Sequence, residues 1–244
     1  MNRADALRTI AAAFVPARSI GVPVFMYHHV NDTHPRAAMA RGLTLPTHVF
    51  EMQLRWLAEH RVTTLTAAEL VDNVRGGEVP ENAVVLTFDD GYADIASIVA
   101  PLLKRYNARA TFFVNAGTIG LRGHVTFREL RAMQADGNEV GAHGMHHLDL
   151  ASLDREGQLH EAGDCIERIG RFTGVRPVSY AYASGGYNAT TLALMPSVGI
   201  RSAWTEHSGR VHDLRDPYQM PRLRIARDTT IAQFAAMVAP HTVQ

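Results

Sequence analysis

The 244-residue sequence contains one cysteine, Cys165, so it cannot build an internal disulfide framework and permits no inference about an oxidising compartment. Its formal net charge is zero, which gives no basis for electrostatic capture of a nucleic acid or an acidic polymer. It also lacks any stretch approaching the ~20 apolar residues that span a bilayer. Disulfide scaffolds, polyanion binders and membrane-spanning proteins are therefore poor descriptions of this chain.

The N-terminal segment carries little that identifies a targeting signal. Met1–Ser19 holds three arginines and a short apolar run, Ile10–Val15, which is shorter than the ~7–15 residues of a secretory core. We expect residues 1–20 to be an N-terminal extension and residues 21–244 to form one domain. On this basis we expect the protein to be cytoplasmic, without a membrane span and without a nucleic-acid partner.

What the chain does contain is a regular alternation of strand-like and helix-like segments. The predicted strands are Val22–Tyr27, Thr63–Leu65, Ala83–Leu86, Ala110–Val114, Glu139–Ala142, Val178–Tyr182, Ile200–Trp204 and Pro221–Ile225. The predicted helices begin near Thr47, Thr66, Ala93, Thr126, Ser152, Ala189 and either Thr229 or Thr230. Such alternation predicts a parallel sheet, either closed into a barrel or doubly wound, and periodicity does not choose between the two.

Three segments carry more specific expectations. Asn31–Leu45 is polar and irregular, and is expected to be a surface loop. The helix over Ala93–Tyr106 contains Pro101, which can kink or split it. A long helix is expected to begin at a cap on Ser152 and to run to about Phe172.

The chemistry concentrates at the ends of two strands. Asp89 and Asp90 follow the buried run Ala83–Leu86, and two ionised carboxylates so close raise one another's pKa unless a cation lies between them. Downstream, His143 and His147 form an HxxxH pair after another strand. One carboxylate and two imidazoles leave an open position on a tetrahedral metal, which a catalytic site needs. Their placement after strand ends is typical of the C-terminal face of a barrel.

These two motifs resemble those of the polysaccharide deacetylase family, the NodB-homology or carbohydrate esterase 4 group. The resemblance covers roughly residues 22 to 227. It also rests on the segments Met26–Val30, Ala110–Val114, Tyr180–Tyr182, Gly185–Asn188 and Met220–Arg222. It implies a distorted (β/α) barrel of about seven parallel strands. It further implies Asp90, His143 and His147 as metal ligands and Asp89 as general base, with His146 as a supporting or surface residue.

The third segment departs from the family pattern. Relatives usually read Phe-Ala-Tyr-Pro-Tyr-Gly there, whereas this chain has Ala183 and Ser184 in place of the proline and the second aromatic residue. The resemblance implies that the backbone N–H at Ser184 helps to hold the oxyanion, because any residue except proline keeps that donor. Tyr182 and Tyr187 are the expected substrate contacts. Loss of the aromatic wall leaves the identity of the substrate open.

Two further family features are missing from their usual places. No Leu-x-Leu-His segment supplies a general acid near the C-terminus, and His207, His212, His28 and His29 all remain candidates. Ala181 stands where some relatives carry an arginine beside the base. We expect Arg222 to take that place, to orient the base and to favour its ionised form.

The resulting functional hypothesis is a metal-dependent hydrolase that removes N-acetyl groups from amino sugars of a polysaccharide, oligosaccharide or glycoconjugate and releases acetate. One divalent ion is expected, zinc first, although cobalt, nickel, iron and manganese also suit the ligands. Two alternatives stay open. One is a non-sugar C–N amide hydrolase with a small closed pocket, and the other is a degenerate glycan-binding protein without turnover.

Overall fold

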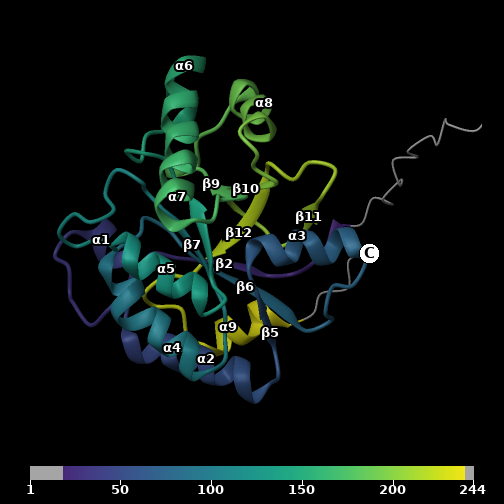
Figure 1. The fold of residues 1–244 in the computed structure, drawn as a ribbon. Coiled ribbons are helices and arrows are strands. Elements are labelled where there is room, and N and C mark those ends of the chain that lie inside the picture. The colour runs from purple at the N-terminus through teal and green to yellow at the C-terminus, as the bar shows by residue number, and fades with distance from the viewer. Residues whose placement is uncertain (1–18, 240–244) are drawn as a thin grey trace, which may run out of the picture.

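Seven parallel strands close into a barrel in the computed structural model, which describes residues 19–239 (Figure 1). Around the ring they are β2 (Val24–Tyr27), β12 (Met220–Arg224), β10 (Ser202–Ser208), β9 (Ser179–Ala181), β8 (Glu139–Ala142), β7 (Thr111–Val114) and β6 (Ala83–Phe88). The ring closes because β6 pairs with β2, from Val85 opposite Val24 to Phe88 opposite Tyr27. The predicted distorted barrel is therefore confirmed, and the doubly wound sheet is excluded.

The distortion arises at one edge of β6. The first half of that edge pairs with an extra parallel strand, β5 (Thr63–Leu65), and only the last two residues, Thr87 and Phe88, pair with β7. A register shift between Trp204 and Ser208 adds a second irregularity where β10 meets β12. Strand pairing is therefore uneven around the barrel, both in the number of paired residues and in register.

Helices surround the strands (Figure 1). Their bounds are α2 (Thr47–Glu59), α3 (Ala67–Gly76), α4 (Ala100–Arg105), α5 (Phe127–Ala135), α6 (Arg155–Gln158), α7 (Cys165–Thr173), α8 (Ala189–Ser197) and α9 (Ile231–Val238). Capping boxes at Thr66 and Thr126 open α3 and α5 as predicted, and Thr230, rather than Thr229, caps α9. Each box satisfies backbone N–H groups that the first helical turn leaves without partners.

Alternation along the strands divides the core into two parts. One set of side chains packs inside the barrel and against α3, and includes Val24, Val85, Phe113, Ala181, Trp204 and Met220. The neighbouring set packs under the outer helices, and includes Phe25, Leu86, Phe112, Tyr180 and Ala203. Because the parity of each strand is fixed, Thr87, Asp89 and Arg222 belong to the side that faces the barrel interior.

The expectation for one irregular segment needs correction. Asn31–Leu45 is not a simple loop, because it contains a short helix, α1 (Ala38–Gly42), and a strand, β4 (Thr44–Leu45). That strand pairs with β3 (His29–Val30), directly after β2. These elements follow a barrel strand at its C-terminal end, so they stand beside the mouth of the barrel.

One helix begins and breaks differently from its prediction, and another is split as expected. Ser152 ends a 3₁₀ turn, η2 (Leu150–Ser152), and the side chain of Asp154 caps the helix that follows. That helix is interrupted by a π-helical turn, η3 (Leu159–Asp164), between α6 and α7. Near Pro101 the expected split is found, since another π-helical turn, η1 (Ile95–Val99), precedes α4.

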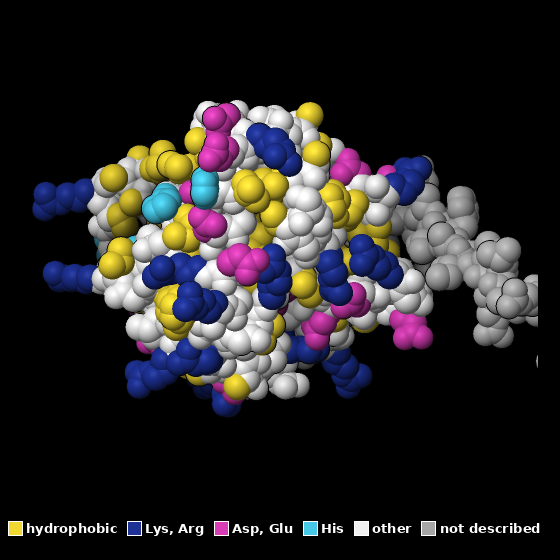
Figure 2. Space-filling view, turned by 45° about the horizontal axis from the view of Figure 1, so that its top comes forward, with side chains coloured by type: hydrophobic (Ala, Val, Ile, Leu, Met, Phe, Trp, Pro, Cys, Tyr) yellow, Lys and Arg dark blue, Asp and Glu magenta, His cyan; other side chains and the backbone are white. Residues whose placement is uncertain are grey.

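The N-terminal extension lies almost entirely outside the described residues, so the domain boundary near residue 20 stays a prediction. Its last two residues form β1 (Ser19–Ile20), which pairs antiparallel with β11 (His212–Asp213). Among residues 19–239, every helix is too short or too polar to cross a bilayer. Figure 2 shows positive and negative side chains interspersed over one face, in keeping with the zero formal net charge.

Candidate active site

A cleft of about 570 Å³ opens at the C-terminal ends of the barrel strands. Its lining comes from segments that follow different strands, which is where the active sites of such barrels lie. The lining residues are His28, Met39, Leu43, Asp90, Tyr92, Asn115, Thr118, His124, His147, Ser184, Glu206 and Arg224. Sequence analysis singled out four of these, namely His28, Asp90, His147 and Ser184.

The turn after β6 separates the two adjacent aspartates. Asp90 has a φ of 75°, in the left-handed region that residues other than glycine seldom adopt, and Gly91 has the same value. A Cβ atom at Gly91 would lie 3.1 Å from side-chain atoms of Val114, so this position requires glycine. The reversal lets Asp89 continue into the barrel interior while Asp90 turns toward the cleft.

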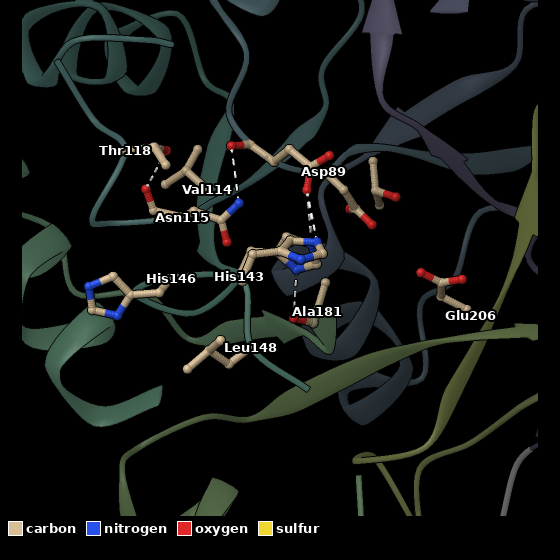
Figure 3. A network of polar contacts seen from close by, with 12 residues as sticks. Asp89, Val114, Asn115, Thr118, His143, His146, Leu148, Ala181 and Glu206 are labelled. Atoms are coloured by element: carbon tan, nitrogen blue, oxygen red, sulfur yellow. Dashed lines mark hydrogen bonds and ion pairs between the residues drawn. The ribbon is translucent and has the colours of Figure 1, made fainter. Parts of the chain in front are cut away.

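Asp90 meets both predicted histidines. Its Oδ1 lies 3.4 Å from Nε2 of His143 and 3.2 Å from Nε2 of His147. One candidate ligand atom from each of the three residues lies within 4.8 Å of the others. Nδ1 of His143 donates a hydrogen bond of 2.8 Å to the carbonyl of Ala181 (Figure 3). This bond leaves Nε2 of His143 free to face Asp90.

This arrangement fits a cation. Within residues 19–239, the buried Oδ1 of Asp90 has no well-formed hydrogen bond, although two imidazole nitrogens stand beside it. Burial raises the pKa of Asp90, but the neighbouring histidines outweigh burial and hold the pKa well below its usual range. An ionised carboxylate and two imidazole nitrogens that converge on one point match the ligands of a divalent metal.

Asp89 has a different partner. The guanidinium of Arg222 donates two hydrogen bonds of 2.8 Å, from NH1 to Oδ1 and from NH2 to Oδ2 of Asp89. NH1 also donates to the hydroxyl of Thr87 at 3.1 Å, and Nε donates to the carbonyl of Thr205 at 3.0 Å. The proximity of Arg222 to Asp89 that the sequence suggested is therefore found, in the bidentate form that only arginine provides.

The pair is enclosed in the barrel, with Arg222 fully buried and Asp89 1% exposed. Burial raises the pKa of Asp89, but the charge and hydrogen bonds of Arg222 lower it more, so its pKa lies below the ordinary value. Asp89 consequently stays ionised at neutral pH. It lies next to Asp90 in the chain, directly beneath the cleft.

The structure separates the four histidines that remained candidates for the general acid. His28 lines the cleft, where burial lowers its pKa and the carboxylates of Asp89 and Asp90 oppose that shift. His29 is held 2.8 Å from Asp94 and is stacked on Tyr92.

The other two histidines point elsewhere. His207 is exposed and does not line the cleft. His212 is buried beside β1, where its Nε2 lies 2.8 Å from the carbonyl of Val22 and burial lowers its pKa to about 4. Val22 precedes β2, so His212 lies toward the opposite end of the barrel from the cleft.

Comparisons with known proteins agree with this geometry. A sequence model of the polysaccharide deacetylase family matches residues 76–203, more than half of the chain. The chain belongs to the polysaccharide deacetylase family. The resemblance noted from the motifs is therefore confirmed.

Individual relatives of this polysaccharide deacetylase family member cover most of its length. YxkH of Bacillus subtilis (strain 168) is 27% identical over 218 residues, covering 89% of this chain and 76% of that protein. The poly-beta-1,6-N-acetyl-D-glucosamine N-deacetylase of Staphylococcus aureus (strain MRSA252) is 26% identical over 196 residues, covering 73% and 67%. The solved Streptococcus pyogenes deacetylase PplD, in complex with acetate, shares the fold with a TM-score of 0.85 at 24% identity, covering 91% of this chain and all of that one.

The third segment of this family member is only partly as predicted. Ser184 lines the cleft and has a φ of 56° within a 3₁₀ turn, η4 (Ala183–Gly185). Tyr182 is fully buried, and its hydroxyl donates to the carbonyl of Tyr218 at 2.9 Å. Tyr187 is half-buried, stacks on Tyr182 and is not among the residues that line the cleft, so substrate contact by either tyrosine stays a prediction.

Several cleft residues were missed from the sequence. Tyr92 directly follows the Asp89–Gly91 motif, so its position beside the site could have been inferred. His124 carried no such signal, because the loop that holds it is brought to the cleft only by folding. Arg224 and Glu206 form an ion pair of 2.6 Å at the cleft, and they come from β12 and β10.

We expect His143→Ala to abolish binding of a divalent ion, because two remaining ligands seldom hold one. The matched control is His146→Ala, in the same loop but with its side chain directed away from the cluster (Figure 3). Metal content after gel filtration, measured by atomic emission, checks both variants. Metal retained at the wild-type level by His143→Ala would rule out the proposed ligand set.

Proposed function

We propose that the protein is a metal-dependent hydrolase that removes N-acetyl groups from amino sugars of a polysaccharide, oligosaccharide or glycoconjugate. The observation that carries this proposal is the meeting of Asp90, His143 and His147 above an ionised, buried Asp89. The Staphylococcus aureus relative, named for its action on a polymer of N-acetyl-D-glucosamine, supports an N-acetylated hexosamine as the substrate unit.

Asp90, His143 and His147 would hold one divalent ion, with zinc favoured and cobalt, nickel, iron or manganese also compatible with the ligand types. When bound, such an ion supplies Lewis-acid activation of water and of the acetyl carbonyl. The hydrogen bond from His143 to the carbonyl of Ala181 fixes the ring in the tautomer that such a site needs.

Asp89 is the proposed general base. Each of its oxygens accepts one hydrogen bond from Arg222 and keeps a second lone pair. In the proposed reaction, Asp89 takes a proton from water as the water oxygen attacks the acetamide carbon. The C–N bond then breaks, the nitrogen gains a proton, and acetate and a primary amine are released. Arg222 would hold Asp89 in the orientation and charge state that this transfer requires.

His28 is the proposed general acid, since it is the one of the four candidate histidines that lines the cleft. It would protonate the departing amine. The backbone N–H of Ser184, in the turn beside His147, would donate to the developing oxyanion. This donor does not depend on the side chain, so replacement of the family's usual aromatic residue leaves the role intact.

The lining of the cleft favours a glycan over the small cyclic substrate of the alternative hydrolase. Met39, Leu43 and Tyr92 are apolar or aromatic lining residues that suit the face of a sugar ring, and Met39 is 80% exposed. The degenerate binding protein is disfavoured because the chain keeps a fully buried Arg222–Asp89 pair. Glycan binding alone requires no such base.

The central test is turnover of a β-1,6-linked oligomer of N-acetylglucosamine, with β-1,4-linked chitooligomers in parallel and acetate release as the readout. Chelation should remove activity, and added Zn²⁺ should restore it. Asp89→Asn should retain the metal and lose ~10²–10⁴ in rate, because the amide cannot accept the proton. An Asp89→Asn enzyme with full turnover would refute the base assignment, and metal-loaded wild-type protein inert on all N-acetylated oligomers would refute the proposed function.

For His28, we expect His28→Gln to slow the release of an alkyl amine by ~10²–10⁴, since the leaving nitrogen must be protonated. Hydrolysis of p-nitrophenyl acetate, whose leaving group needs no proton, should fall much less. His124→Gln, which alters another histidine of the cleft, should not separate the two substrates. Equal losses on both substrates in His28→Gln would contradict an acid role.

For Arg222, removal of the guanidinium should raise the pKa of Asp89, because Arg222 is what holds that pKa down. The acidic limb of the kcat/KM profile should then move to higher pH in Arg222→Ala, and less far in Arg222→Lys. Arg201→Ala serves as control, because Arg201 pairs with Asp72 at 3.0 Å, outside the cleft. An acidic limb that stays in place in both the Arg222→Ala and the Arg222→Lys proteins, each shown to be folded, would show that Arg222 does not tune the base.

A further inference from the structure

The loop that carries His147 has an unusual backbone. His147 has a φ of 61° and Gly144 has a φ of 93°, both in the left-handed region. For a residue other than glycine, that conformation is strained, because Cβ comes too close to the following carbonyl oxygen. The loop therefore needs an external contact that holds this shape, and the Asp90–His147 approach of 3.2 Å depends on it.

Glu161 supplies that contact. Its Oε1 accepts the backbone N–H of His146 at 2.8 Å and the backbone N–H of Leu148 at 3.1 Å, one on each side of His147. Its main-chain carbonyl accepts the N–H of Met145 at 3.0 Å. Its Oε2 lies 3.4 Å from Nδ1 of His146. Glu161 thus accepts hydrogen bonds from three backbone N–H groups of the loop, those of Met145, His146 and Leu148.

The two backbone N–H groups that flank His147 favour a carboxylate as their partner. Backbone N–H groups on either side of a left-handed residue form a concave site for an anion, and hydrogen bonds to a carboxylate are stronger than those to a neutral oxygen. A Cβ atom at Gly144 would lie 2.5 Å from Oε1 of Glu161, so the loop is shaped around the carboxylate. Any side chain at position 144 would displace it.

Glu161 is buried in a helical turn. It lies in the π-helical turn η3, between α6 and α7, and is 3% exposed. Such turns are frequent at functional sites because they redirect one side chain of a helix. Figure 3 shows the side chain of His146 directed away from the cluster that His143 enters. Because Oε2 of Glu161 lies 3.4 Å from Nδ1 of His146, Glu161 lies on the side of the loop away from that cluster.

We propose that Glu161 is a positioning residue that fixes the loop so that His147 reaches the metal site, an inference that rests on the proposed metal-dependent function. Glu161 touches neither the ligand atoms nor the cleft. It acts by holding the two amides that flank His147. Loss of the carboxylate frees the strained backbone, and His147 then no longer meets Asp90 and His143 at one point.

The experiment compares Glu161→Ala, Glu161→Gln and wild type in the full chain. Glu139→Ala is the matched control, because Glu139 is also a buried carboxylate that accepts a backbone N–H, from Ala68 at 2.9 Å, but at the other end of β8. Three quantities are measured: the Kd for Zn²⁺ by chelator competition, the visible absorption of the Co²⁺-substituted protein, and amide hydrogen exchange at residues 144–150 without metal.

We expect Glu161→Ala to weaken Zn²⁺ binding ~10–100-fold, to alter the Co²⁺ spectrum and to speed exchange in the loop. Glu161→Gln should recover part of the affinity, because its amide oxygen can still accept. Glu139→Ala should lower thermal stability and leave the Kd unchanged.

Wild-type affinity in folded Glu161→Ala and Glu161→Gln, or an equal loss in Glu139→Ala, would overturn the positioning role. Absence of Zn²⁺ binding by wild type would instead overturn the proposed function, so the two failures are distinguishable.

Discussion

The site depends on one buried ion pair. Arg222 and Asp89 lie inside the barrel, where removing either partner would leave an uncompensated charge at a cost of ~3–5 kcal/mol. The pair spans two strands, β12 and β6, that stand on either side of β2. Further bonds from Arg222 to Thr205 and Thr87 satisfy the rest of the guanidinium. The guanidinium of Arg222 thereby connects β12 with β10 and with the end of β6, and it keeps Asp89 ionised next to the cleft.

That pair also explains how two neighbouring aspartates are kept ionised in one place. Asp89 is neutralised from inside the barrel by Arg222, whereas Asp90 is turned outward by its left-handed backbone and faces two imidazoles. Each carboxylate therefore has its own positive or cation-accepting environment, and neither needs to be protonated to relieve the other. Gly91, which also has a positive φ, lets the chain reverse its direction directly after Asp90.

The two histidine ligands are supported in different ways. His143 directly follows β8, so the strand and its hydrogen bond to Ala181 fix its ring. His147 stands on a loop with 41% of its side chain exposed, and its backbone is held from behind by Glu161. His143 stays next to the strand end, whereas His147, four residues further along, depends on the conformation of the loop. The precision of the site then depends on Glu161, which lies outside the HxxxH motif in the π-helical turn η3.

The sequence by itself determined the strand and helix alternation and the caps at Thr66 and Thr126, because these follow from local periodicity and short-range spacing. Its motifs also resemble those of the polysaccharide deacetylase family, and that resemblance implied Asp90, His143 and His147 as the ligand cluster. Only the tertiary structure decided which histidine lines the cleft, that Tyr182 is buried, and that Arg222, expected beside Asp89, holds it with two hydrogen bonds across 133 residues of chain. The physical reason is ring closure. Alternation assigns each side chain to one of two faces of a strand, but which strands become neighbours, and so which side chains meet, is set only when β6 pairs with β2.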